Sequence, residues 1–144
     1  MFCFVLGLAL FGADASAMFI VNQPWVVPAA KGRSTEAYMD LTSSDEARLI
    51  AARSDAAQEV RVRGGPRSTR SLSKLALPAG RMIRLAPHSY RLVLDKLTRR
   101  IKLGERVHLT LVIEAVNGTT QEIPVDAEAR FDSPLDAERR VHQH

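Results

Sequence analysis

The stretch ERVHLTLVIEAVNGTTQEIPVDAEA, residues 105–129, decides the fold of this chain. In its first half, polar residues alternate with the apolar residues Val107, Leu109, Leu111 and Ile113. That is the period of a strand with one buried face. Asn117-Gly118 follows, and this pair is typical of a type I′ hairpin turn. Because Pro124 cannot donate a hydrogen bond, we expect the returning strand to lie at an edge or to turn this position outward.

Short alternations of apolar and polar residues, separated by turn signals, recur along the rest of the chain. They predict strands within residues 18–27, 34–44, 47–54, 58–63, 72–80, 81–87 and 89–97. Pro24 marks an edge or a bend in the first of them. Several short strands without a long helical period predict an all-β sandwich.

The N-terminal segment differs from the rest. Residues 1–17 combine an apolar run with the small residues Ala15-Ser16-Ala17, and this pattern indicates a secretory signal peptide. No Lys or Arg precedes the apolar run, and a buried first strand is the alternative. The run is shorter than the roughly 20 residues of a membrane span. No lipobox surrounds Cys3, so we expect no lipid anchor. We therefore expect one domain over residues 18–126 and a flexible charged tail, residues 127–144, that ends in His-x-His.

Three stretches carry a resemblance to a known family: LPAG (77–80), YRLVL (90–94) and LGERVHLTL (103–111). With a Trp in an early strand and a Tyr in the next, they resemble the PCu(A)C family of periplasmic copper chaperones over residues 21–125. The resemblance implies a Greek-key, cupredoxin-like β-sandwich and a location in the periplasm. It also implies delivery of Cu(I) to the CuA centre of cytochrome c oxidase, so that this oxidase or another copper-handling protein is the expected partner.

The same resemblance implies two His-x-Met pairs as copper ligands, together with a further Met in a loop. Residue by residue, the first pair falls on Arg61 and Arg63, and the second on Arg91 and Val93. The loop Met falls near residues 69–72, where the chain is shortened. A guanidinium stays protonated and has no lone pair to offer a metal. The resemblance therefore implies the fold, whereas its metal site is not expected here.

Other residues could hold copper weakly. His142 and His144 form the terminal His-x-His, and His88 lies in a turn beside the family's site. Met82 could join either His88 or His108. The alternative is that these are solvent-exposed residues without a metal. We expect His108 to point outward from its strand.

Charge is distributed unevenly along the chain. Residues 61–106 contain thirteen Lys and Arg but only two acidic residues, a net charge of +11, which leaves −7 for the remainder of a +4 chain. If the family fold holds, Arg61, Arg63 and Arg91 converge on one face, where they suit a small anion or an acidic protein partner. The alternative is a solvated basic surface. Nucleic acid is not an expected partner, because only 6% of residues are aromatic.

Enzyme motifs are missing from the sequence. There is no nucleophile elbow, zinc-protease motif or glycine-rich phosphate loop. Two hypotheses remain: a copper-chaperone-like protein that holds any copper at the residues named above, and a metal-free binding module that uses its arginines. In neither case do we expect an enzyme.

Overall fold

The computed structural model describes residues 17–65 and 70–142 of the 144-residue chain, most of them in strands. In chain order the strands are β1 (Phe19–Val26), β2 (Thr35–Ser43), β3 (Ala47–Ser54), β4 (Ala57–Arg63), β5 (Ser71–Leu72), β6 (Leu75–Leu77), β7 (Ile83–Leu85), β8 (Arg91–Leu97), β9 (Arg106–Ala115) and β10 (Thr120–Ala129). A helix, α1 (Pro134–Val141), follows them.

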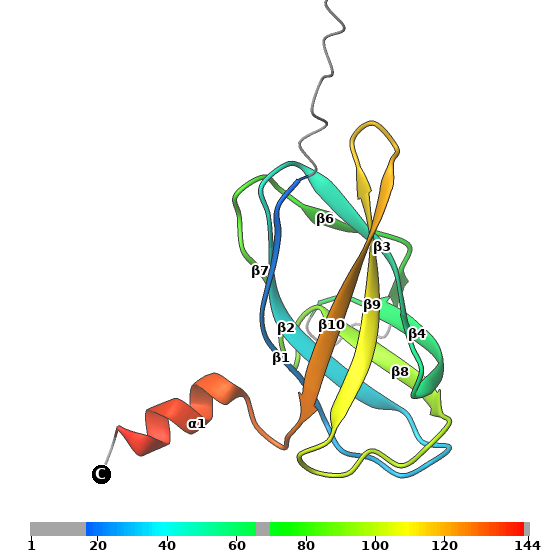
Figure 1. Ribbon diagram of the computed structural model, residues 1–144, viewed down its shortest axis with the longest axis vertical. Coiled ribbons are helices and arrows are strands. Elements are labelled where there is room, and N and C mark those ends of the chain that lie inside the picture. The colour runs from blue at the N-terminus through cyan, green and yellow to red at the C-terminus, as the bar shows by residue number, and fades with distance from the viewer. Residues whose placement is uncertain (1–16, 66–69, 143–144) are drawn as a thin grey trace, which may run out of the picture.

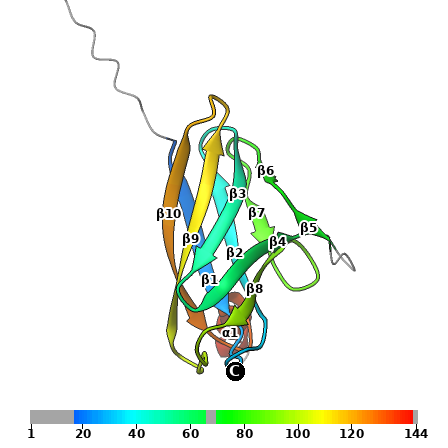
Figure 2. The same cartoon turned by 90° about the vertical axis from the view of Figure 1, so that its right-hand side faces the viewer.

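The strands form one curled sheet with β1 between β2 and β10 (Figure 1). Neighbouring strands follow the order β5-β4-β8-β2-β1-β10-β9-β3-β6, and β7 pairs with β2. β3 also pairs with β4 through Ala52 and Val60, which brings the two sides of the sheet together. In Figure 2, β10, β9 and β3 form the near side, and β1 and β2 lie behind them. The expected all-β, Greek-key sandwich is therefore confirmed.

Alternate residues of the strands fill the core between these sides. Leu92 and Leu94 of β8 are fully buried, as their alternation with Arg91 and Asp95 predicts. Met39 is 2% exposed and belongs to the same core. Other large, fully buried side chains are Leu41, Leu49, Leu77, Ile101, Leu109 and Leu111. Each buried Leu contributes about 1.5–3 kcal/mol, so this apolar interior holds the sandwich together.

The β9–β10 hairpin forms where the sequence predicts it, but its turn is different. The Gly118 N–H donates to the Ala115 carbonyl oxygen at 2.9 Å, so Val116 and Asn117 are the central residues of the turn. Gly118 has φ +84°, whereas Asn117 is not among the residues with positive φ. A type I′ turn needs positive φ at both central residues, so that prediction was wrong. Gly118 instead follows the turn in the left-handed region, which glycine adopts without a Cβ clash.

Of the two prolines singled out by the sequence, Pro24 lies at a register shift and Pro124 at an edge of the sheet. β1 shifts register between Asn22 and Trp25, around Pro24, and Gln23 there has φ +51°. β10 meets β1 only over its last two residues. At Pro124 the described structure therefore gives β10 a single neighbour, β9, so the predicted edge position is confirmed.

Regular structure continues past residue 126, where the sequence predicted the start of an irregular tail. β10 runs on to Ala129, whose side chain is fully buried, and α1 follows. The Ser133 side-chain oxygen caps α1 by accepting a hydrogen bond from the Leu135 N–H at 3.2 Å, and Pro134 occupies the first turn. Regular structure thus replaces the loss of alternation predicted for residues 127–129 and 134–141. The inward-facing positions near the end of β10 are small alanines, and the charged positions between them obscured the pattern.

Residues 1–16 of the predicted signal peptide lie outside the described residues, and so does His144. The signal peptide and the metal-ligand role of His144 remain predictions. No helix in the described part of the chain has the length and hydropathy of a membrane span.

Candidate functional site

The four positions to which the resemblance assigns copper ligands lie on neighbouring strands. β4 and β8 are antiparallel, with Arg61 opposite Val93 and Arg63 opposite Arg91. Opposite residues project from the same face of a sheet, and the core-facing leucines of β8 occupy the other face. The structure thus brings all four positions together on the outer face, which we call the β4–β8 face.

Two of the three arginines on the β4–β8 face already have acidic partners in this chain. Arg61 donates from Nη2 to Glu59 Oε2 at 2.9 Å, and its Nε lies 3.4 Å from Asp95 Oδ2. The hydrogen bond from Arg61 lowers the pKa of the Glu59 carboxyl. Arg91 donates from Nε to Glu36 Oε1 at 2.9 Å. The positive charge predicted for this face is therefore largely balanced by carboxylates.

The Glu36 carboxylate also connects this face to two aromatic residues. The Tyr38 hydroxyl donates to Glu36 Oε2, the oxygen that Arg91 Nε does not use. The ring of Tyr38 lies against that of Trp25, with centroids 4.6 Å apart. Burial raises the pKa of Tyr38, and the hydrogen bond to Glu36 raises it further. Because the Arg91 side chain is only 13% exposed, this cluster is packed rather than freely solvated.

Arg63 differs from the other two arginines. Its Nε is buried without a hydrogen-bond acceptor, and no ion pair of Arg63 is found among the described residues. The next residue, Gly64, is closely packed: a Cβ there would lie 2.6 Å from Leu72 Cδ1 and 2.8 Å from Tyr90 Cε1. At the β4–β8 face, Arg63 thus keeps an Nε–H donor that no described residue accepts.

The side chains on the β4–β8 face do not fit a copper ion. Cu(I) prefers thioether, thiolate and imidazole donors, whereas this face presents three guanidinium groups, a valine and carboxylates bound to two of the guanidiniums. A guanidinium offers a metal no lone pair and repels a cation. Its planar set of N–H donors instead suits the oxygen atoms of a carboxylate or a phosphate.

Two of the three predicted histidine ligands, His88 and His142, lie within the described residues. His88 is exposed with φ +66°, and His142 is exposed at the end of α1. His108 points outward, as expected, and pairs with Asp126. Over residues 17–65 and 70–142, no group of three or more His, Cys, Asp and Glu side chains could hold a metal.

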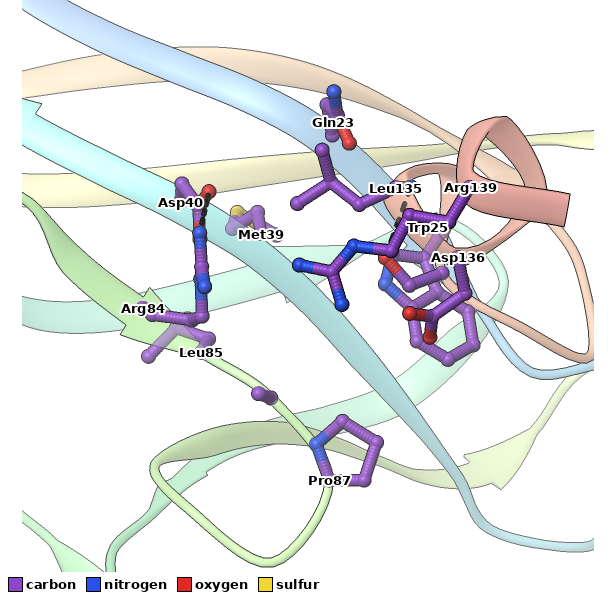
Figure 3. Close-up of a pocket in the computed structure, with 12 residues that line it drawn as sticks. Gln23, Trp25, Met39, Asp40, Arg84, Leu85, Pro87, Leu135, Asp136 and Arg139 are labelled. Atoms are coloured by element: carbon purple, nitrogen blue, oxygen red, sulfur yellow. Dashed lines mark hydrogen bonds and ion pairs between the residues drawn. The ribbon is translucent and has the colours of Figure 1, made fainter. Parts of the chain in front are cut away.

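A cavity of about 200 Å³ lies between β1, β2, β7 and α1 (Figure 3). Trp25, Met39 and Leu135 contribute to its apolar part. Arg84 and Asp40 form a two-hydrogen-bond ion pair on one wall, and Arg139 extends from α1 on the other side. The volume suits a molecule little larger than benzene. Sequence reasoning missed this cavity, because α1 was expected to be irregular.

Sequence reasoning also missed the pairing of the arginines with Glu36, Glu59 and Asp95. The strand alternation places Asp95 on the same face as Arg91, but it does not show that Arg61 lies beside Asp95. The pairing of Glu36 with Arg91 depends on β2 lying beside β8, which no local pattern specifies.

Comparison with known proteins gives a family and a fold. Residues 20–125 match the family described as "Putative lipoprotein LpqE-like". Among solved structures, the apo PCuAC domain from PmoF1 is 22% identical, with 78% of this chain and 92% of that chain covered and a TM-score of 0.67. The copper-bound PCuAC domain from PmoF2 is 21% identical, with 78% and 92% covered and a TM-score of 0.64.

A third structure, CuI-DR1885 from Deinococcus radiodurans, is 25% identical, with 83% of this chain and 85% of that chain covered and a TM-score of 0.59. The search of curated proteins found no match. The predicted likeness to PCu(A)C proteins is thus confirmed in the fold. Since the family match spans most of the sandwich, this chain belongs to the LpqE-like family and has the β-sandwich of the PCuAC domains.

Proposed function

We propose that this chain is an exported, copper-chaperone-like protein that acts as a metal-free binding module. The β4–β8 face is the observation that carries the proposal. Arg61 and Arg91 are bonded there to carboxylates of the same chain, and Arg63 lies between strands without an acceptor for its Nε. These are positions to which the resemblance assigns copper ligands, and their chemistry suits an anion better than a cation.

The ligand of this face is a carboxylate or phosphate group, presented by an acidic protein partner or a small anion. Arg63 would supply the first hydrogen bonds. Arg61 and Glu59 are both about half exposed, and an exposed ion pair contributes only about 0–1 kcal/mol. An incoming carboxylate could therefore replace Glu59 as the partner of Arg61 at little cost. Export to the periplasm through residues 1–17 forms part of the same proposal.

Nuclear magnetic resonance titration tests the binding. Phosphate and a polyglutamate peptide should shift backbone amides of β4 and β8, and Arg63→Gln should weaken both effects. Arg84→Gln is the matched control, because Arg84 is also an exposed arginine but lies on β7 and pairs with Asp40 of β2. Equal weakening by the two substitutions would count against a site at the β4–β8 face.

Copper delivery is the second candidate function, favoured by the two copper-bound structures among the similar folds. It would make cytochrome c oxidase or another copper-handling protein the partner. Titration with Cu(I) and Cu(II) separates the candidates. We expect no tight binding, and any weak Cu(II) binding should disappear when residues 132–144, which include His142 and His144, are removed. One tightly bound equivalent that survives this truncation would overturn the metal-free proposal.

A further inference from the structure

One end of the sandwich is built from two connections that lie side by side. They are residues 27–34, between β1 and β2, and residues 98–105, between β8 and β9, and both lie at the end opposite to the start of β1 (Figures 1 and 2). Ala29 and Ile101 exchange two backbone hydrogen bonds, at 3.2 and 2.9 Å. The Gly32 N–H donates to the Leu97 carbonyl oxygen at 2.8 Å. Because Leu97 and Ile101 are buried in the core, these connections are fixed to the sandwich.

This end concentrates cations that lack acidic partners. The connections 27–34 and 98–105 contain a single carboxylate, Glu105, and with Lys96 near the end of β8 they carry six cations: Lys31, Arg33, Lys96, Arg99, Arg100 and Lys102. Only Arg99 forms an ion pair among the described residues, with Glu105 at 3.0 Å, and the other five cations are exposed. We call these six residues the basic end. Unlike the β4–β8 face, it keeps most of its charge.

Two large apolar side chains are exposed beside the basic end. Leu103 directly follows Lys102 and is 64% exposed, and Phe131, just after β10, is 71% exposed. Both line one open groove of about 580 Å³, which also contains Arg130 and Arg140 together with Glu128 and Asp132, the carboxylates that pair with them. Leu103 thus stands beside an unpaired cation, Lys102, and exposed apolar side chains next to cations are a combination that peripheral membrane-binding surfaces use.

We propose that the basic end binds the surface of a membrane rich in anionic phospholipid. The lysine and arginine side chains contact headgroup phosphates, while Leu103 and Phe131 enter the boundary between headgroups and acyl chains. The observations favour lipid over an acidic protein, because the cations are long side chains on projecting connections and few hydrogen bonds fix their orientation. Headgroup phosphates in a fluid membrane can move to meet cations whose orientation is not fixed, and the same membrane provides an apolar layer for Leu103 and Phe131.

This inference goes beyond the proposed function, since it uses a different surface. Arg63 belongs to the β4–β8 face, along the side of the sandwich, whereas the basic end closes one of its ends. Arg63→Gln should therefore leave membrane binding unchanged. The two proposals can fail independently of each other.

Vesicle co-sedimentation tests the proposal. The protein used is the chain from Met18 to His144, which contains every strand and helix described. It should bind vesicles of equal parts phosphatidylcholine and phosphatidylglycerol at low salt, bind phosphatidylcholine vesicles poorly, and dissociate at high salt. Lys31→Gln with Lys102→Gln should weaken partitioning by roughly 25-fold, because each cation near an anionic surface contributes about fivefold.

The matched control is Lys74→Gln with Arg81→Gln. It removes the same charge from residues on either side of β6, toward the other end of the sandwich (Figure 1), and should change partitioning by less than about threefold, since that end does not face the membrane. Leu103→Ser should weaken binding while the salt dependence stays the same. Cooperative thermal unfolding of each variant verifies that it folds.

Three results would overturn the proposal. The first is equal partitioning onto the two kinds of vesicle. The second is equal weakening by the two double substitutions, which would show a response to net charge alone. The third is salt-sensitive binding of the basic end to polyglutamate without binding to vesicles, which would assign this surface to an acidic protein.

Discussion

The charge of Arg63 should control how the β4–β8 face treats a copper ion, and designed ligands can measure that effect. The parent for the comparison carries Arg61→His, Arg91→His and Val93→Met, which places three copper donors on one face. In this parent, Arg63→Leu removes the charge without adding a donor. Arg63→Lys keeps the charge and is the matched control.

The expected magnitude follows from the strand register. Arg63 lies directly opposite residue 91, and opposite side chains in an antiparallel pair start about 5 Å apart. Two unit charges at about 5 Å repel by about 1 kcal/mol in water and about 3 kcal/mol at the effective dielectric constant of a protein surface. The carboxylates of Glu36, Glu59 and Asp95 are present with and without the Arg63 substitution, so the difference in affinity reports the charge at position 63. Arg63→Leu should therefore tighten Cu(I) binding about five- to 150-fold.

Competition with a chromophoric Cu(I) chelator under anaerobic conditions gives the affinities. The effect of Arg63→Leu should shrink as salt is raised, because screening weakens a partly exposed charge. Equal Cu(I) affinities of the Arg63→Leu and Arg63→Lys proteins would refute the electrostatic reasoning. Tight Cu(I) binding at the β4–β8 face of the unmodified chain would refute it as well.

Three further predictions concern the same region. Arg91→Met should lower the free energy of unfolding by about 1–3 kcal/mol in chemical denaturation, because it leaves a half-buried carboxylate without its cation; a double-mutant cycle with Glu36→Gln that showed no coupling would contradict this. Gly64→Ala should destabilise the chain by about 1–3 kcal/mol, because the added methyl overlaps neighbouring side chains; unchanged thermal unfolding would show that this contact relaxes freely. The raised pKa of Tyr38 means that its contribution to stability is complete below its ordinary value of 10.0 and is lost as the pH rises above it; in a Tyr90→Phe protein, which leaves Tyr38 as the single tyrosine, tyrosinate absorbance that developed fully near pH 10 would contradict this.

Most of the strands could be predicted from the sequence, because the evidence for a strand is local. Leu92 and Leu94 alternate with outward residues within five positions, and the structure buries both. The end of β10 and the helix α1 could not be predicted in the same way. Ala127 and Ala129 bury so little apolar surface that the alternation is weak, and α1 buries no residue completely, so its sequence lacks a strong apolar stripe.

The candidate site was predictable in part. Matching the family motifs to the chain identified Arg61, Arg63 and Arg91, and the register places them on one face. Their partners were not predictable. The sequence predicted a concentrated positive charge there, and the structure shows a nearly balanced network in which Arg63 stands apart.

By itself, the sequence determined the alternation of the strands and the excess of +11 between residues 61 and 106. Only the tertiary structure decided where that charge stays free. Strand pairing brings Glu36 to Arg91 across 55 positions and Asp40 to Arg84 across 44, so acidic residues from the early strands neutralise part of the basic stretch. At the basic end only Arg99 has such a partner among the described residues, because the two connections contact each other through Ala29 and Ile101 and carry no acidic residue besides Glu105.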